Sequence, residues 1–216
     1  IDDIAVMRTL PNMTILETGD ATEVEGICEA ADSIDGPVYC RILRGAVPRL
    51  FDTPLKVGNI RKLNDGNDIL VVTSGITTEE ALRASSPLKK AGISIKHIHL
   101  NTLKPINEDE ISEYIYSVKY GVISLENHLV NGGIGSLIAE IIAKFGIAKK
   151  LIKLGLQDTF AHGGSKSYLM KYYGLDAYAL IKAIEKIIKQ ELKITEEDLD
   201  NVRIDDVHSL SKAEAL

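Results

Sequence analysis

Two side chains suited to proton transfer follow an apolar run in the middle of the sequence. Glu126 and His128 come directly after GVISL, and a glycine cluster follows them at Gly132, Gly133 and Gly135. The carboxyl end of a strand is where parallel sheets hold their ligands, and an imidazole there can act as an acid or a base. The stretch therefore has two interpretations, an acid–base site or a structural turn.

The glycine cluster precedes an apolar helical pattern, the position at which glycines often cradle a phosphate. A dinucleotide site needs G-x-G-x-x-G after a strand and an acidic residue about 20 residues later, and a Walker loop needs Gly-Lys-Ser/Thr. Neither pattern is present. We therefore predict that these glycines let the chain turn sharply and let the helix approach its neighbours closely.

The histidines and cysteines lack the spacing that is typical of metal ligands. His97 and His99 alternate on a predicted strand and so face one side, but no third ligand is spaced to join them. Cys28 and Cys40 are too few for a disulfide framework, and we expect reduced thiols. The sequence predicts no metal site in this chain.

The hydrophobic pattern alternates strands with helices along most of the chain. Apolar runs predict strands at 13–17, 38–43, 55–63, 69–75, 93–100, 121–127 and 150–156. Helical spacing predicts helices at 1–10, 20–33, 77–92, 107–118, 133–145, 165–173 and 176–190. We expect a tight connection between the strands at 55–63 and 69–75, and a turn at 101–106.

Capping residues mark the beginnings of two of these helices. Asp20 precedes one helix with Glu23 in the reciprocal position, and Thr77 precedes another with Glu80 in that position. The order of elements predicts an α/β fold, with a three-layer α/β/α domain around a mostly parallel (mixed) sheet.

The chain divides into three parts of unequal size. Residues 53–192 are enough to bury a core, whereas residues 1–52 bury too little apolar area to offset their ordering entropy. The first part either docks on the larger domain or is the end of a domain whose beginning is absent, and we favour the second alternative. Residues 193–216 form an acidic tail with a weak pattern.

Four stretches resemble the transketolase family of thiamine-diphosphate enzymes, and their order and spacing match that family. YGVISLENHLVNGGIGSLIA at 120–139 resembles its C-terminal domain, in which an acid-x-His pattern precedes a GG-x-G helix start. DIAVMRTLPNM at 3–13 and DGPVYCRILRG at 35–45 resemble segments near the end of its pyrimidine-binding domain. LGLQDTFAHGGSKSYLMKYYGLD at 154–176 resembles its late signature.

The resemblance implies that residues 1–52 are the C-terminal remnant of a pyrimidine-binding domain and that residues 53–192 are a transketolase C-terminal domain. It implies an enzyme that transfers a two-carbon ketol unit from a ketose phosphate to an aldose phosphate. Thiamine diphosphate and a divalent metal (Mg²⁺) would lie between two chains of the complete enzyme. The expected partners are a second copy in a homodimer, the N-terminal transketolase section, and phosphorylated sugars.

The family's catalytic residues are not expected in this chain. The glutamate that activates the cofactor and the aromatic pocket for its pyrimidine ring lie upstream of the segment that matches residues 3–13. The diphosphate- and metal-binding GDG…N motif is also missing from the sequence. We therefore expect no catalytic residue, no bound cofactor and no activity from this chain alone.

The resemblance also implies roles for individual residues. Arg44 stands where the family places an arginine that contacts the sugar phosphate, and a guanidinium can bind phosphate with two hydrogen bonds. Arg8, on the first predicted helix, is expected to have a structural role, as an ion pair or a cap. Glu126, His128 and the glycine cluster are expected to be structural or interface residues, because the family's C-terminal domain lies away from the cofactor.

Composition and charge limit the partners and the cellular location that we expect for this protein. A net charge of −6 argues against a nucleic-acid surface. No apolar run approaches the roughly 20 residues that span a bilayer, and no signal peptide is visible, so we expect a cytoplasmic protein without a membrane partner.

Two competing functions stay open. ILETGD replaces the commoner V-x-P-A-D, which leaves room for a related thiamine-diphosphate enzyme, either 1-deoxyxylulose-5-phosphate synthase or a 2-oxo acid dehydrogenase beta subunit. The alternative from another class is a non-catalytic α/β interaction module.

Overall fold

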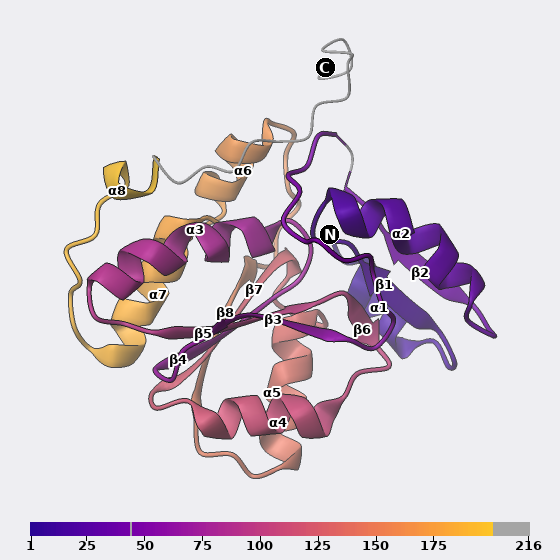
Figure 1. Cartoon of the computed structure of the whole chain (residues 1–216), viewed down its shortest axis with the longest axis horizontal. Coiled ribbons are helices and arrows are strands. Elements are labelled where there is room, and N and C mark those ends of the chain that lie inside the picture. Colours follow the sequence, from indigo (N-terminus) through magenta and orange to yellow (C-terminus); the bar gives the residue numbers. More distant parts are fainter. Residues whose placement is uncertain (44, 201–216) are drawn as a thin grey trace.

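The computed structural model of the chain describes residues 1–43 and 45–200, which form two sheets with helices packed around them (Figure 1). Arg44 and most of the predicted acidic tail, residues 201–216, lie outside the described residues. The described part of that tail contains the short helix α8 (Glu197–Asp200). None of the described helices is long and apolar enough to cross a bilayer.

A three-stranded sheet is built mainly from the first 43 residues. Its elements are α1 (Asp3–Thr9), β1 (Thr14–Glu17), α2 (Ala21–Asp32), β2 (Val38–Arg41) and, from much later in the chain, β6 (Thr102–Lys104). The strand order is β2-β1-β6, with β1 parallel to β2 and antiparallel to β6.

Strand β6 corrects the prediction of a turn at residues 101–106. It pairs with the open edge of β1 and buries Leu103, which is 1% exposed. A strand of three residues carries too little alternation to be recognised in a sequence, and the edge that stabilises it comes from a distant segment.

A five-stranded sheet forms the centre of the larger part. Its strands are β3 (Ile60–Asp65), β4 (Ile69–Thr73), β5 (Ile95–Leu100), β7 (Gly121–Leu129) and β8 (Lys150–Leu156). The order is β3-β5-β4-β7-β8, and only β3 is antiparallel to its neighbour. The predicted mostly parallel, mixed sheet is therefore confirmed.

Helices cover both faces of this sheet, as Figure 1 shows. The helices are α3 (Thr77–Lys90), α4 (Glu108–Ser117), α5 (Ile134–Lys144), α6 (Lys166–Tyr172) and α7 (Ala177–Ile188). Ile69 and Val71 of β4 belong to the core shared with α3 and α7, whereas Leu70 and Val72 belong to the core shared with α4 and α5. Strand β4 is thus apolar on both sides because both sides are covered.

The tight connection between β3 and β4 does not make them neighbours, contrary to what a hairpin would require. Strand β5 lies between them and pairs with both. The reason is burial: every residue of β4 is buried, so β4 takes a central position, whereas the partly exposed β3 occupies the sheet edge.

The two predicted helix caps have different outcomes. Asp20 caps α2, because its Oδ1 accepts a 2.8 Å hydrogen bond from the Glu23 N–H. Thr77 is instead the first residue of α3, and its hydroxyl lies 2.8 Å from the Ser74 carbonyl and 2.7 Å from that of Leu125. The cap prediction for Thr77 is wrong because a tertiary contact to β7 takes its side chain.

The first 43 residues pack on the larger part. Ile4 of α1 and Ile15 of β1 are buried in the same apolar cluster as Leu70 of β4 and Ile138 of α5. This docking is the first of our two alternatives for residues 1–52. The second, the end of a domain whose beginning is absent, stays a prediction, and so do the boundaries at 52 and 192.

We predict that Ile15→Ala lowers the free energy of unfolding of the whole chain by about 2–5 kcal/mol, because it leaves a cavity in the shared core. Urea unfolding followed by circular dichroism measures this. Ile42→Ala is the matched control at a side chain that is 47% exposed, and its effect should stay within about 0.5 kcal/mol. Equal effects of the two substitutions would contradict a shared core.

Candidate functional site

The carboxyl ends of β4 and β7 form the place where this sheet would hold a ligand. The connection through α3 leads from β4 to β5 on one side, and the connection through α5 leads from β7 to β8 on the other. In open α/β sheets such a reversal leaves a crevice at the strand ends, and ligands bind there. We call this place the switch-point crevice.

Glu126 of β7 closes the beginning of α5. Its carboxylate accepts hydrogen bonds from the N–H groups of Ile134 at 2.7 Å and Gly135 at 2.9 Å. The N-cap residue, Gly133, has no side chain to do this, and a Cβ built there would lie 1.9 Å from the Glu126 Oε2. The glycine is required by the buried carboxylate, which supports the architectural interpretation of the cluster.

Gly132 and Gly135 make similarly close approaches. Gly132 has φ +84°, and a Cβ there would lie 2.3 Å from the Cβ of Ala5. A Cβ on Gly135 would lie 2.7 Å from the Ser124 hydroxyl and from the Lys153 side chain. The cluster therefore brings α1 and α5 close to β7.

His128 has both ring nitrogens engaged. Its Nε2 accepts a 3.3 Å hydrogen bond from the Ala5 N–H, and its Nδ1 donates 2.8 Å to the Leu129 carbonyl. Burial lowers the pKa of this imidazole, so the neutral ring is favoured. A neutral, fully bonded histidine holds α1 against β7 and is poorly placed for proton transfer.

Arg8 holds α1 on the glycine cluster. Its Nη1 donates to the Gly132 carbonyl at 2.8 Å, and its Nη2 pairs with Glu140 of α5 at 2.6 Å. These contacts are consistent with a structural role, which remains a prediction. Arg44 lies outside the described residues, so its role in binding phosphate also remains a prediction.

Arg41 at the end of β2 fills the switch-point crevice and was not among the residues predicted from the sequence. Its Nε pairs with Asp3 at 2.7 Å, its Nη2 donates to the Asn127 carbonyl at 2.9 Å, and its Nη1 pairs with Glu17. Burial raises the pKa of Asp3, but the charge and hydrogen bonds of Arg41 outweigh it and leave that pKa low. The only sequence signal was an arginine inside an otherwise apolar strand.

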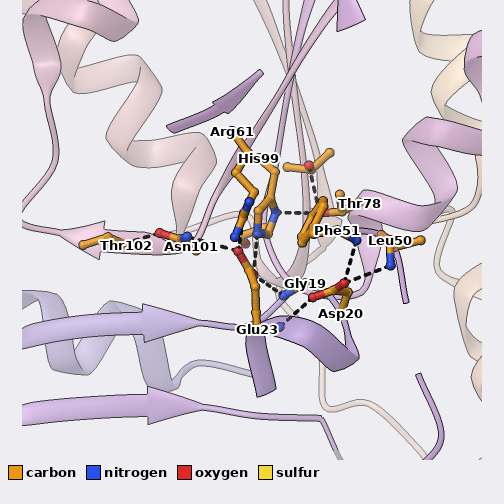
Figure 2. A network of polar contacts seen from close by, with 12 residues as sticks. Gly19, Asp20, Glu23, Leu50, Phe51, Arg61, Thr78, His99, Asn101 and Thr102 are labelled. Carbon is orange, nitrogen blue, oxygen red and sulfur yellow. Dashed lines mark hydrogen bonds and ion pairs between the residues drawn. The ribbon is translucent and has the colours of Figure 1, made fainter. Parts of the chain in front are cut away.

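A second polar network lies between α2 and the larger sheet, centred on Glu23 (Figure 2). The Glu23 carboxylate accepts from the Gly19 N–H (2.9 Å), Arg61 Nε (2.7 Å), His99 Nε2 (3.0 Å) and Asn101 Nδ2 (3.0 Å). Burial raises the pKa of Glu23, but hydrogen bonds led by that of His99 outweigh it and lower the pKa to about 2. The neighbouring Asp20 accepts from the N–H groups of Leu50 and Phe51.

A chain of hydrogen bonds continues from this network into the sheet. His99 Nδ1 lies 2.7 Å from the Thr78 hydroxyl, which lies 3.0 Å from that of Thr73, which lies 2.9 Å from His97 Nε2. His97 Nδ1 has no partner among the described residues. Burial lowers the pKa of His97 to about 3, so its ring is neutral.

The unpaired His97 Nδ1 sets the direction of that chain. A buried acceptor without a partner is tolerated better than a buried N–H without one, so the proton of His97 lies on Nε2 and is donated to Thr73. Thr73 then donates to Thr78, and Thr78 donates to His99 Nδ1. This order leaves the Nε2 of His99 to donate to the Glu23 carboxylate.

Most of the buried polar groups described above are held by hydrogen bonds within the chain, although His97 Nδ1 and Glu17 Oε2 have no partner among the described residues. The buried carboxylates and imidazoles bind to helix ends, arginines or one another. Within residues 1–43 and 45–200 no group of three His, Cys, Asp or Glu side chains could hold a metal ion. The arrangement joins segments, and it offers no free acid–base pair of its own.

We predict that Glu126→Gln changes how stability depends on pH. Burial raises the pKa of Glu126 to about 7 from the ordinary 4.5, although the N–H groups of Gly135 and Ile134 oppose this. Between those values the folded chain binds more protons than the unfolded chain, so the ionisation of Glu126 lowers wild-type stability as pH rises. The variant should lose less stability across this window, by on the order of 1–3 kcal/mol. Urea unfolding at several pH values, with the exposed Glu113→Gln as control, measures this, and parallel curves for Glu126→Gln and wild type would refute it.

Comparison with known proteins places the chain and its fold in a family. The family model "Transketolase, C-terminal domain" matches residues 58–180. A protein of Methanocaldococcus jannaschii named "Putative transketolase C-terminal section" is 35% identical over 194 residues, which cover 88% of this chain and 60% of that protein. An apulose-4-phosphate transketolase subunit of Actinobacillus succinogenes is 33% identical, over 84% of this chain and 59% of that protein.

A solved structure agrees with these sequence matches. It is described as "Split gene transketolase, inactive beta4 tetramer", is 34% identical and superposes with a TM-score of 0.80 over 88% of this chain and 61% of that one. The chain thus spans about three fifths of the length of these relatives. The family model spans the five-stranded sheet, and the relative and the solved structure each match 88% of this chain, so the chain belongs to the transketolase family.

Proposed function

We propose that this chain is the C-terminal section of a transketolase that transfers a two-carbon ketol unit from a ketose phosphate to an aldose phosphate. The observation that carries the proposal is the match to the split gene transketolase, at 34% identity and a TM-score of 0.80. The relative from Actinobacillus succinogenes is named for apulose 4-phosphate, which is a sugar phosphate of the expected class.

The proposal divides the work between this chain and a partner. Thiamine diphosphate, bound with Mg²⁺ in the complete enzyme, would supply the electron sink for breaking and forming the C–C bond. In this proposal the rest of the complete enzyme supplies that site, and most buried acids and imidazoles of the described residues make hydrogen bonds within the chain. Their part is to hold the end of the pyrimidine-binding domain on the C-terminal domain, through Glu23 and Arg41.

The proposed partner is the N-terminal transketolase section. Two relatives are named as one subunit and as the C-terminal section of a transketolase, which supports such a division between two polypeptides. The split gene structure is described as an inactive tetramer of beta chains. We therefore infer that this chain also associates with copies of itself and is inactive until the N-terminal section joins it.

A second candidate is the decarboxylating synthase of the same superfamily. 1-Deoxy-D-xylulose-5-phosphate synthase of Bacteroides fragilis is 33% identical to this chain over 85% of it, although only 29% of that enzyme is covered. The contacts between the first 43 residues and the larger part of this chain are compatible with either enzyme. The substrate therefore decides between the two functions.

We predict that this chain, mixed with its N-terminal section, thiamine diphosphate and Mg²⁺, transfers a ketol unit from a ketose phosphate to an aldose phosphate. Either section alone should show no transfer, because the cofactor site is completed only by assembly. Decarboxylation of a 2-oxo acid without ketol transfer would favour the synthase. Failure of the two sections to associate would favour the non-catalytic interaction module.

We predict that Arg44→Ala in that assembled enzyme lowers kcat/KM for phosphorylated donors, because a charge-assisted contact to the phosphate is lost. The decrease should correspond to a loss of about 1–3 kcal/mol of transition-state stabilisation. Turnover of the matching unphosphorylated ketose should be unchanged. Arg49→Ala is a suitable control, because Arg49 pairs with Glu25 at the surface. An equal effect on both ketoses would leave Arg44 with a structural role only.

A further inference from the structure

The loop after β8 and the helix α6 expose aromatic side chains that the core of the chain does not use. Phe160 is 100% exposed, Tyr168 is 51% exposed and Tyr172 is 62% exposed. Tyr168 and Tyr172 are one turn apart, so they lie on the same side of α6. On the opposite side Met170 is buried in the core that α3 and α7 share. Helix α6 is therefore held by one side, and its tyrosines face solvent at the upper edge of the molecule in Figure 1.

The exposed rings contact one another and hold the preceding loop on α6. The ring centroid of His162 lies 4.9 Å from that of Tyr172 and 5.6 Å from that of Tyr173, and those of Tyr168 and Tyr172 are 5.7 Å apart. The Tyr173 hydroxyl accepts a 3.1 Å hydrogen bond from the His162 N–H and lies 2.9 Å from His162 Nδ1. We call these four residues and Phe160 the α6 aromatic surface. Because four of its rings are already ordered, a partner that binds there loses less free energy to ordering.

The area of this surface is large for a side of a protein that faces only water. At about 200 Å² for a whole aromatic side chain, Phe160, Tyr168 and Tyr172 together expose about 400 Å². An apolar area of this size on one surface often marks a site of protein–protein interaction. Two such surfaces face to face would bury about 800 Å² through these rings alone, which is half of the roughly 1,600 Å² of a standard interface. The neighbouring residues 157–167 are all exposed and can contribute the remaining area.

The two lysines of α6 are balanced by acids of the same chain. Lys166 pairs with Glu79 at 3.0 Å, and Lys171 pairs with Glu196. Two copies of the surface can therefore approach each other with little repulsion between these lysines. The centres of protein–protein interfaces are typically poor in charged residues and rich in tyrosine and phenylalanine, as this surface is.

A second copy of this chain is the partner that these features favour. The self-association inferred for the chain needs an exposed contact area on each copy. Glu126 and His128, for which the family resemblance suggests a structural or interface role, are buried and bonded within the chain. They therefore offer no such area, whereas the α6 aromatic surface does. In a two-fold contact the same patch meets itself, so an uncharged aromatic patch is complementary to its own copy.

We propose that the α6 aromatic surface is the contact through which two copies of this chain associate about a two-fold axis. The inference rests on the self-association in the proposed function and adds the surface that mediates it. Phe160 and Tyr172 form the centre of the contact, because their rings are the most exposed of the surface. Residues 157–159 and 163–167, which are mostly small or polar, form its rim.

Sedimentation equilibrium of the purified 216-residue chain over a range of concentrations tests this contact. Phe160→Ala and Tyr172→Ala should each raise the dissociation constant of self-association about tenfold or more, because each removes a central ring from both copies. Tyr116→Ala is the matched control at an exposed tyrosine of α4, and it should leave the dissociation constant within about twofold. Phe160 is fully exposed, so Phe160→Ala keeps the fold and decides the question if Tyr172→Ala does not fold.

Three results would overturn the proposal. They are a wild type that is monomeric at every concentration, self-association that neither substitution weakens, and equal weakening by Tyr116→Ala. If the substitutions weaken binding of the N-terminal section but leave self-association unchanged, the surface contacts that section and the proposal is also wrong. Ketol transfer by the assembled wild-type enzyme is a separate measurement, and its absence would count against the proposed enzyme activity while leaving the self-association result unchanged.

Discussion

The structure depends on the buried carboxylate of Glu23 and on the four donors that surround it. A carboxylate removed from water must recover its lost hydrogen bonds, and an incomplete shell would cost several kcal/mol. Only one of the four donors, the N–H of Gly19, comes from the same section of the chain. Arg61, His99 and Asn101 come from β3, β5 and the segment after β5. The carboxylate is therefore satisfied only when the two sections are joined in one arrangement.

In the switch-point crevice, too, buried charged groups from one section are paired with groups of the other. A sheet of this type would normally offer a ligand site between the ends of β4 and β7. Here the crevice receives Asp3, Glu17 and Arg41 from the first 43 residues, and Glu126 turns back to close α5. The strand ends that could hold a ligand therefore contact the first 43 residues instead. This is why a domain with a ligand-binding topology has a supporting role in the proposed enzyme.

A supporting section still affects the reaction, because it must hold the chains in a fixed geometry. A cofactor held between two chains reacts only if the chains meet in a fixed geometry, since misplacement of about 1 Å can lower a rate a hundredfold. A junction of charged groups with most of their hydrogen-bonding capacity used has few alternative arrangements. Among the described carboxylates of this junction, the Oε2 of Glu17 is the oxygen without a hydrogen-bond partner.

The sequence by itself determined the elements, the fold class and the family. The apolar periods located nearly every helix and strand, Asp20 marked a true cap, and the four motifs pointed to the transketolase family. These features are local, because a period or a cap reports the burial and the hydrogen bonds of residues close together in the chain. The motif at 35–45 also contained Arg41, but nothing in its spacing gave the partners of that residue.

Only the tertiary structure decided which segments meet. The place of β5 between β3 and β4, the pairing of β6 with β1, and the contact of Thr77 with β7 all join distant segments. Arg41 likewise gathers Asp3, Glu17 and the Asn127 carbonyl, which are spread over more than half of the chain. Such contacts are chosen by competition among all buried surfaces and polar groups at once, and a pattern along the sequence carries no record of that competition.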